Sequence, residues 1–406
     1  MSSAGEGAGP DSAAADRPSG VAGGARYLPE LEGLRGVAML LVLAFHTDAL
    51  LHMQNRPPAG EVVPLPYALV RNGGDLGVDL FFVLSSFLLT LAFLREPAPG
   101  SASSLRAYAR RRALRILPLY YFAVLVAVLV HTRTPADLAR GLPYLAFLNV
   151  GDGWTTPLLP FSGVWWSLAT EAQFYVTLAL AAWLFRSPGG RRVGGLALGA
   201  WLVAYVAWLS GAVRAGGIGA QWALSFSLFG RAPSFLGGAA VAWLFARHGA
   251  ALRARFAGRW AALGAGVALG VVVLLIAVLM RWVIRFGSIA SQFPAWQGYH
   301  VLQSLLCGAL LALVVFAAAP ARTALSHPAL LRLGVLSYSM YLWHLPILFA
   351  GLMLARAAGV ALGAGWTWRG TALVAACWGL CFGVSTLTYR FVERPFLVRK
   401  ARLGAA

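Results

Sequence analysis

Long apolar runs constrain this chain more than any other feature of its sequence. A run of roughly 20 apolar residues is long enough to cross the ~30 Å hydrocarbon layer of a bilayer as a helix. With 59% hydrophobic residues and a mean hydropathy of +0.71, the 406-residue chain has too little polar surface for a water-soluble protein. The sequence therefore predicts an all-α polytopic membrane protein, a bundle of about ten transmembrane helices. The ten candidate runs are 34–51, 76–94, 113–131, 164–185, 193–212, 222–245, 261–283, 301–319, 333–354 and 370–391.

The distribution of basic residues predicts how these spans are oriented. When successive loops are assigned to alternate sides of the membrane, the side that includes both termini holds 20 Lys and Arg residues and the other side holds 9. Because basic loops stay on the cytoplasmic side, we expect both termini inside and a multi-pass location in the bacterial cytoplasmic membrane. The same bias accounts for the net charge of +19, so we expect no nucleic-acid partner.

The sequence divides into three parts. Residues 1–26 are rich in Ala, Gly, Ser and Pro and are expected to form a disordered N-terminal tail. Residues 27–396 contain all the apolar runs and are expected to form one transmembrane domain, while 397–406 read as a short basic C-terminal tail. The three cysteines lie in apolar runs without metal-ligand spacing, so no metal is expected.

The first apolar run carries two ionisable residues that a simple membrane anchor does not need. Such a residue inside a span costs roughly 2.5–3.5 kcal/mol, so it needs a partner, a cavity or a function. Arg35 lies near the cytoplasmic end, and His46 lies eleven residues further on, in the outer half. At 100° per residue both face the same way, about 16 Å apart along the helix axis. We expect Arg35 to bind an anionic cofactor and His46 to handle a proton.

Three further ionisable residues fall inside other spans. Asp79 in the second run is predicted at a depth similar to that of His46, Glu171 lies two turns into the fourth run, and His344 lies near the middle of the ninth. We expect these side chains to converge, with Asp79 or Glu171 orienting the His46 imidazole. The alternatives are a purely structural role for the two carboxylates and, for His344, a hydrogen bond to a carbonyl freed by Pro346.

The stretch "YARRRALRILPLYY" gathers arginines at the inner end of the third run, including Arg112 and Arg115. Guanidinium groups suit phosphate, so this cluster is a candidate cofactor site together with Arg35. Its alternative role is a positive-inside topology signal. A phosphate site about 16 Å from an imidazole fits a donor with a long, thin arm, such as the pantetheine arm of an acyl-CoA, with acetyl-CoA most expected.

Candidates for binding the acceptor lie mainly on the fourth run. They are Trp166 and Tyr175, together with His344. Trp166 and its neighbour Trp165 also fit an interfacial aromatic belt, and that alternative stays open.

Six segments, in order, resemble the acyltransferase-3 family of integral membrane acyltransferases, over residues 27–396. The resemblance implies ten spans and transfer of acyl groups, commonly acetyl, from acyl-CoA to hydroxyls of sugars and other acceptors. It also implies that Arg35 and His46 form the family's pair separated by ten residues, with the histidine required for transfer, and that Arg112 and Arg115 form its Arg-x-x-Arg pair. The segments are "YLPELEGLRGVAMLLVLAFH", "GVDLFFVLSSFLL", "RRRALRILPLYY", "WSLATEAQFY", "LGVLSYSMYLWHLPI" and "YRFVERPF".

The sequence departs from the family pattern at two positions. Ser86 stands where glycine is usual, and Ala172 replaces the second acid of a pair whose first acid is Glu171. Many relatives also carry a fused periplasmic hydrolase-like domain, whereas this sequence ends at Ala406. The expectation is therefore that the membrane domain itself, or a separate periplasmic protein, serves the acceptor.

The predicted function is direct acyl transfer. His46 removes the proton from an acceptor hydroxyl as it attacks the thioester, although an acyl-histidine intermediate stays open. The acceptor is either a macrolide-like metabolite, which is slightly favoured, or a cell-envelope glycan. The alternative function is a proton-coupled transporter in which His46, Asp79 and Glu171 form a proton relay. Transporters usually show paired halves, and no such repeat is visible here.

Overall fold

The computed structural model is mostly helical in its described part. Helices account for 89% of it and it contains no strand. The expected N-terminal tail, 1–26, lies outside the described residues. These are 27–51, 64–150, 162–213, 216–284, 293–317, 319–359 and 368–405.

Nine helices in this part of the chain are long and apolar enough to cross a membrane, which confirms an all-α polytopic membrane protein. The remaining predicted span, 164–185, is also helical, but Glu171 and Gln173 interrupt its apolar sequence. The elements are α2 (Pro29–Leu51), α3 (Leu65–Arg71), α4 (Gly73–Leu94), α5 (Ala102–His131), α6 (Pro135–Arg140), α7 (Leu142–Leu145), η1 (Ser162–Trp165), α8 (Trp166–Leu184), α9 (Pro188–Leu209), α10 (Ile218–Phe226), α11 (Leu228–Arg255), α12 (Arg259–Ile284), α13 (Phe293–Ala312), η3 (Leu313–Ala317), α14 (Ala319–Leu325), α15 (Pro328–Ala357), α16 (Trp368–Thr388), η4 (Tyr389–Glu393) and α17 (Arg394–Ala405).

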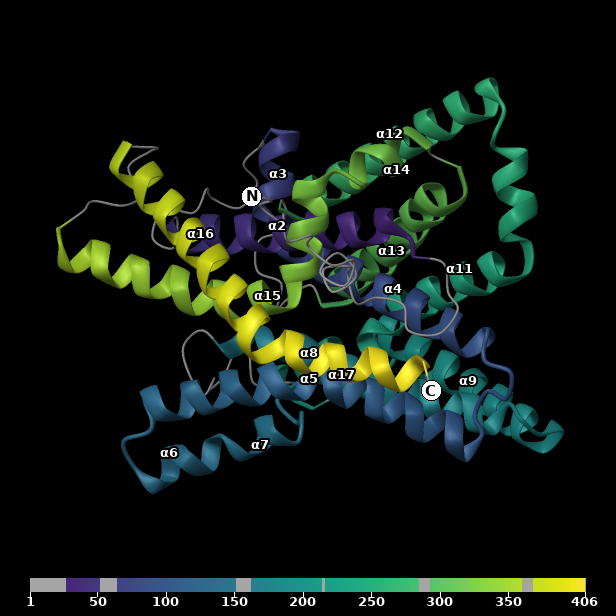
Figure 1. Ribbon diagram of the computed structural model, residues 1–406, viewed down its shortest axis with the longest axis horizontal. Helices are drawn as coiled ribbons and strands as arrows, with labels where there is room; N and C mark the ends of the chain where they lie inside the picture. Colours follow the sequence, from purple (N-terminus) through teal and green to yellow (C-terminus); the bar gives the residue numbers. More distant parts are fainter. Residues whose placement is uncertain are drawn as a thin grey trace, which may run out of the picture.

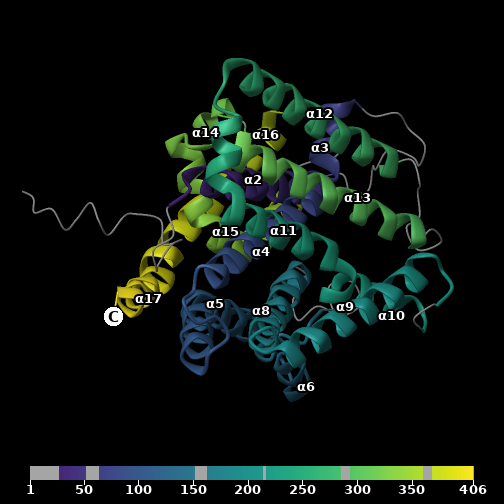
Figure 2. The same ribbon diagram turned by 90° about the vertical axis from the view of Figure 1, so that its right-hand side faces the viewer.

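Helix α4 is the centre of the bundle (Figures 1 and 2). It packs against α2, α11 and α13, and 67% of its apolar window is buried, more than in any of the other eight spans. Gly77 on one side of α4 faces Ala38 and Val42 of α2, while Val83 on another side meets Gly238 of α11. The remaining side faces a cavity. Helix α4 therefore links the first helix, the α11–α13 pair and the cavity.

Small residues allow α2 and α15 to approach closely. A Cβ added to Gly36 of α2 would lie 2.5 Å from the backbone oxygen of Leu330 in α15, and one added to Gly334 would collide with the backbone of Glu32. Backbone atoms cannot move aside as a flexible side chain can. This contact fixes the position of the first helix, which carries Arg35 and His46.

The C-terminal segment, which includes the predicted basic tail 397–406, is helical as far as Ala405. Helix α16 continues through the π-helical segment η4 into α17. The chain changes direction between α16 and α17, and α17 runs beside α5 (Figures 1 and 2). Leu397 and Lys400 on one side of α17 are buried, whereas Val398 and Arg399 are exposed. An amphipathic pattern in a short charged segment therefore gives a packed helix.

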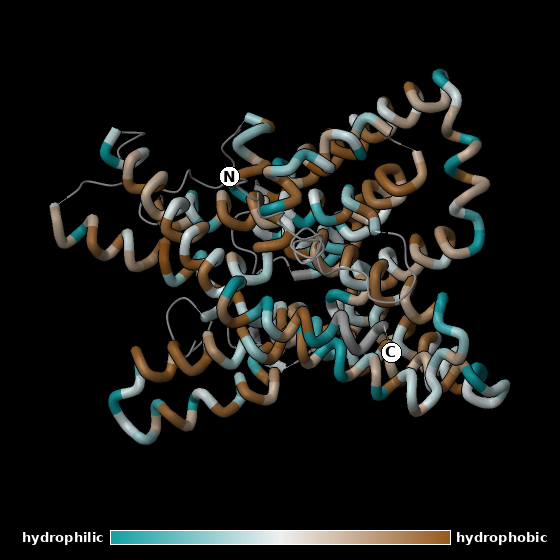
Figure 3. Tube along the Cα trace, in the orientation of Figure 1, coloured by the Kyte–Doolittle hydropathy of each residue, from teal (hydrophilic) through white to brown (hydrophobic). Residues whose placement is uncertain are grey.

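Hydropathy along the trace agrees with this arrangement. Figure 3 shows hydrophobic residues along the helices, and hydrophilic residues mainly at the turns and near the centre of the bundle.

Candidate active site

A cavity of about 680 Å³ lies between α2, α4, α5, α8, α15 and α17. Helix α4 supplies one largely apolar wall from Val78, Phe82 and Leu89, which recur at helical spacing on one side. The other helices supply most of the polar groups. The basic residues that line the cavity are Arg35, Arg95, Arg111, Arg112, Arg115 and Lys400.

Positive charge exceeds negative charge in this cavity. Six basic residues line it against three carboxylates. Arg35 lies 3.9 Å from Glu32, and Arg115 forms an ion pair with the buried Glu393 of η4. Even when Glu393 is added to the carboxylates, the basic residues outnumber them by two. A polyanion is therefore the ligand that best matches the cavity.

The arginines of α5 are held against aromatic rings. The guanidinium carbon of Arg112 lies 6.0 Å from the centroid of Tyr175, and that of Arg115 lies 5.7 Å from Tyr338. The buried Nε of Arg112 has no hydrogen-bond partner among the described residues. Arg112 therefore keeps a donor for a ligand, while Arg115 is already paired. The predicted site residues Arg35, Arg112 and Arg115 thus share one cavity, and the exposed Arg110 does not line it.

Glu171 also faces the cavity. It accepts a hydrogen bond from Ser85 and joins α8 to α4, and Tyr175 one turn further along α8 lines the same space. The side chains that hydrogen-bond to Glu171 are those of Ser85 and Tyr175, and not that of His46. Glu171 is therefore placed beside a ligand in the cavity and does not orient the imidazole.

His46 and His344 are neighbours. His46 Nδ1 lies 2.9 Å from the carbonyl oxygen of Val42 and 3.3 Å from His344 Nε2. His344 Nδ1 lies 2.8 Å from the carbonyl oxygen of Tyr341. Because a carbonyl oxygen only accepts, each Nδ1 carries the proton in the neutral ring. His344 Nε2 then accepts from His46, and the Nε2 of His46 keeps its lone pair.

The histidine pair adjoins the cavity through Tyr341. Neither imidazole lines the cavity, but Tyr341 does, and its ring centroid lies 5.6 Å from that of His344. The Tyr341 hydroxyl donates to the carbonyl oxygen of Val164, at 2.7 Å, and also lies 2.7 Å from the hydroxyl of Ser167. The carbonyls bonded to His344 are those of Met340 and Tyr341, so the one that Pro346 frees is not its partner.

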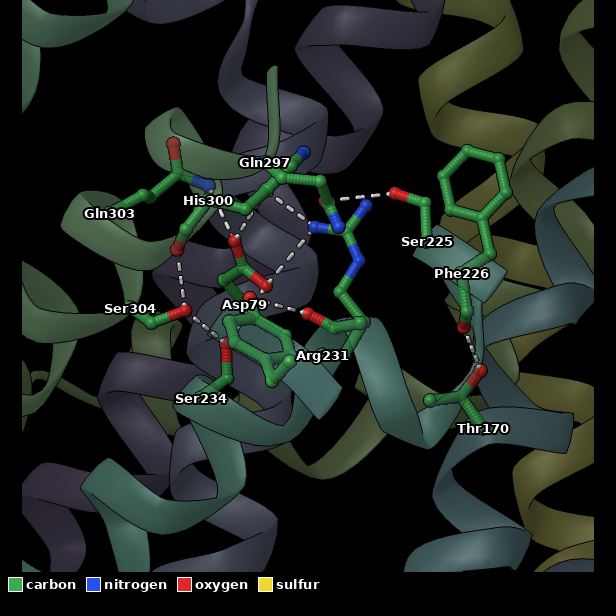
Figure 4. Close-up of polar contacts among 12 residues, drawn as sticks. Asp79, Thr170, Ser225, Phe226, Arg231, Ser234, Gln297, His300, Gln303 and Ser304 are labelled. Atoms are coloured by element: carbon green, nitrogen blue, oxygen red, sulfur yellow. Dashed lines mark hydrogen bonds and ion pairs between the residues drawn. The ribbon is translucent and has the colours of Figure 1, made fainter. Parts of the chain in front are cut away.

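Asp79 lies in a different cluster from the one predicted (Figure 4). It is fully buried, and it pairs with Arg231 of α11 at 3.6 Å and accepts a hydrogen bond from Gln303 of α13 at 2.7 Å. His300 Nδ1 is 3.2 Å from the same carboxylate. Asp79 is two residues past Gly77, about 200° around α4, so it points away from the side that meets α2. Depth along a span was predictable from the sequence, but rotation toward a partner was not.

This separation bears on the proton relay of a transporter. His46 is bonded to His344, Asp79 to the α11–α13 cluster and Glu171 to Ser85. The three predicted relay residues are not hydrogen-bonded to one another, so the structure gives the transporter alternative no support.

Trp166 lies beside the Asp79 cluster and not in the cavity. Its ring centroid is 4.4 Å from that of Phe226 and 5.3 Å from the guanidinium carbon of Arg231. Trp166 is buried, so it does not belong to an exposed interfacial belt. The expected role in acceptor binding has no support from the lining of the cavity.

Sequence reasoning missed several residues in and beside the cavity and in the Asp79 cluster. Arg231, Glu393 and Lys400 are ionisable residues in or near apolar segments, which is a signal that the sequence does carry. Their partners come from helices far apart in the chain, and the sequence alone does not show those contacts.

The cavity, the paired histidines and the motifs on α2, α5 and α8 can be compared with known proteins. The profile of an acyltransferase domain matches residues 28–388. The chain belongs to the acyltransferase-3 family. Within this acyltransferase-3 domain lie Arg35, His46, Arg112 and Arg115, whereas η4 and α17 lie beyond the matched residues.

Two relatives of this acyltransferase-3 protein show how far the similarity extends. The peptidoglycan O-acetyltransferase OatA of Listeria monocytogenes is 25% identical over 408 residues, which cover 91% of this chain and 56% of the relative. YrhL of Bacillus subtilis, provisionally named a peptidoglycan O-acetyltransferase, is 34% identical over 168 residues, or 37% of this chain and 23% of the relative. The chain thus spans about half or less of the length of these relatives. No solved structure matches it.

Proposed function

We propose that this protein transfers an acetyl group from acetyl-CoA to a hydroxyl of a cell-envelope glycan. The observation that carries the proposal is one cavity that is rich in arginine and adjoins a histidine pair through Tyr341. The first relatives are named for acetylation of peptidoglycan, which favours a glycan acceptor over the macrolide-like metabolite.

The charge and the apolar lining of the cavity support this donor. The excess of guanidinium groups suits the phosphates of a nucleotide, and Arg112 retains an unpaired donor for them. The apolar wall of α4 suits the pantetheine arm, since that arm carries no charge. A bound donor would thereby bring its thioester toward Tyr341 and the histidine pair.

The chemistry requires a base. The lone pair on His46 Nε2 accepts the proton of the acceptor hydroxyl while the hydroxyl oxygen attacks the thioester carbonyl. The new C–O bond forms, the C–S bond breaks, and the departing thiolate takes the proton from the imidazolium. While His46 is charged, its Nδ1–H donates to His344 Nε2, so His344 stabilises the imidazolium without receiving the proton.

The test is transfer by the full chain in lipid nanodiscs. Wild-type protein should release CoA from acetyl-CoA and acetylate soluble peptidoglycan fragments, detected by mass spectrometry. His46→Ala should abolish transfer while acetyl-CoA binding persists, because the base is lost but the cavity is not. His248→Ala on α11, where the side chain is exposed, is the matched control and should remain active. Transfer retained by His46→Ala would contradict the mechanism, and acetylation of macrolides alone would contradict the acceptor.

A further inference from the structure

Three residues of α8 face the cavity at a spacing of about one helical turn. Ser167, Glu171 and Tyr175 all line it, and each lies four residues from the next, a rise of about 6 Å. Ser167 marks the histidine end of this row, because its hydroxyl lies 2.7 Å from that of Tyr341. Tyr175 marks the arginine end, because its ring lies against the guanidinium of Arg112. Glu171 therefore lies midway between these two ends.

The wall that α4 presents to Glu171 is apolar except at one position. Of the residues that α4 contributes to the lining between Val78 and Ala92, Ser85 is the only polar one. Its hydroxyl donates a hydrogen bond to Glu171, and Tyr175 is bonded to the same carboxylate. A carboxylate offers about four acceptor positions, so Glu171 can accept a further hydrogen bond from a ligand.

The charge of Glu171 restricts which part of a ligand it can bind. An ionised carboxylate only accepts hydrogen bonds, and it repels a phosphate. The group that suits it is therefore a neutral donor. The pantetheine arm of a coenzyme thioester carries amide groups, whose N–H donors lie between its phosphates and its thioester. With the phosphates near Arg112 and the thioester near Tyr341, these amides lie in the part of the cavity that Glu171 lines.

We propose that Glu171 accepts a hydrogen bond from an amide N–H of the pantetheine arm. The inference rests on the proposed function, because it assumes that the donor occupies this cavity. Ser85 and Tyr175 would act as positioning residues, since their hydrogen bonds hold the carboxylate. The protein would then recognise the arm as well as the nucleotide, and it would favour pantetheine thioesters over thioesters of the same acyl group that lack the amide.

The experiment measures donor binding by calorimetry on the full chain in lipid nanodiscs. The donors are acetyl-CoA and analogues in which each pantetheine amide in turn is replaced by an ester, which removes the N–H but keeps the length of the arm. Glu171→Met should weaken acetyl-CoA binding by about ten- to a hundredfold, the effect of losing a hydrogen bond to a charged group. One ester analogue should bind the wild type more weakly by a similar factor. With that analogue Glu171→Met should cause no further loss, because the hydrogen bond is already absent.

Two variants control for folding. Thr177→Ala, on the same helix but exposed, should bind all the donors as the wild type does. Glu171→Gln, which keeps a neutral acceptor in a side chain of the same size, should recover part of the acetyl-CoA affinity. Equal losses in Glu171→Met for acetyl-CoA and for every ester analogue would indicate a structural role and overturn the inference. It would also be overturned if Glu171→Met raised only the KM for the glycan, since Glu171 would then contact the acceptor.

The outcomes also separate this inference from the proposed function. Wild-type protein that binds no acetyl-CoA would contradict the proposed function itself. Wild-type protein that binds acetyl-CoA while Glu171→Met binds it equally well would contradict only the role of Glu171.

Discussion

At the scale of single residues, the buried Asp79–Arg231 pair should support stability and not proton transfer. Asp79→Asn leaves the Arg231 charge without its counter-ion in an interior site, a change that typically costs about 3–5 kcal/mol. We expect a large fall in the unfolding temperature of the protein in detergent, measured by tryptophan fluorescence.

A double-mutant cycle tests this assignment. Asp79→Asn combined with Arg231→Gln should lose less stability than the sum of the single losses, because no uncompensated charge remains. Additive losses would show that the two side chains do not act as a pair. The fraction of the Asp79→Asn protein that stays folded should also show the same pH dependence of transfer activity as the wild type, since His46 does not contact Asp79.

His344 should affect turnover more than donor binding. His344→Ala removes the acceptor that stabilises the charged His46, an interaction worth about 1.5–3 kcal/mol, so kcat should fall about ten- to a hundredfold. The affinity for acetyl-CoA should stay close to that of the wild type, because His344 does not line the cavity. Steady-state kinetics together with calorimetry provide the measurement, and a loss confined to affinity would contradict the role.

The site was predictable from the sequence to the extent that ionisable residues are rare inside spans. That rarity indicated Arg35 and Glu171, and the structure brings them to one cavity with Arg112, Arg115 and Tyr175, which were predicted on other grounds. The orienting partner of His46 was not predictable. A hydropathy pattern gives the depth of a side chain, whereas its neighbour depends on how two helices are rotated against each other.

At the scale of elements, the close contact of α2 with α15 should be sensitive to a single methyl group. Gly36→Ala places a Cβ 2.5 Å from a backbone oxygen and forces the helices apart, which we expect to cost about 1–3 kcal/mol. Gly264→Ala on α12, where a Cβ meets nothing within 4 Å, is the control and should be neutral or slightly stabilising. Thermal unfolding of the two variants compares them directly, and equal stability would contradict the tight packing.

Helix boundaries show where hydropathy stops being informative. The first span was predicted from residue 34, whereas α2 begins at Pro29 and its first turn includes Glu30 and Glu32, which are buried although they are charged. The run 222–245 was predicted as one span, but it breaks at Ser227, whose hydroxyl accepts the Phe229 N–H and caps α11. Both differences arise from local polar contacts that a window average of hydropathy does not resolve.

At the scale of the whole molecule, the orientation in the membrane follows from the loop charges and can be measured. Ser103, in the first turn of α5, should face the cytoplasm, and Ala136 on α6 should face outside. Cysteines placed at these two exposed positions should react differently with a membrane-impermeant maleimide added to intact cells. Only Ala136→Cys should be labelled before the cells are broken.

The native protein is the control for that measurement. Its three cysteines, Cys307, Cys377 and Cys381, are buried and should not react. Labelling of Ser103→Cys in intact cells would reverse the predicted orientation and place the arginine-rich end of the cavity on the outer side.

The central position of α4 has a consequence for how the protein is made. Asp79 enters the bilayer early, but its partner His300 is 221 positions later in the chain. Until α11 and α13 emerge from the ribosome, the second span carries an acid with no native counterpart. Assembly therefore cannot be completed one hairpin at a time: the early helices must wait, loosely associated, for the late ones.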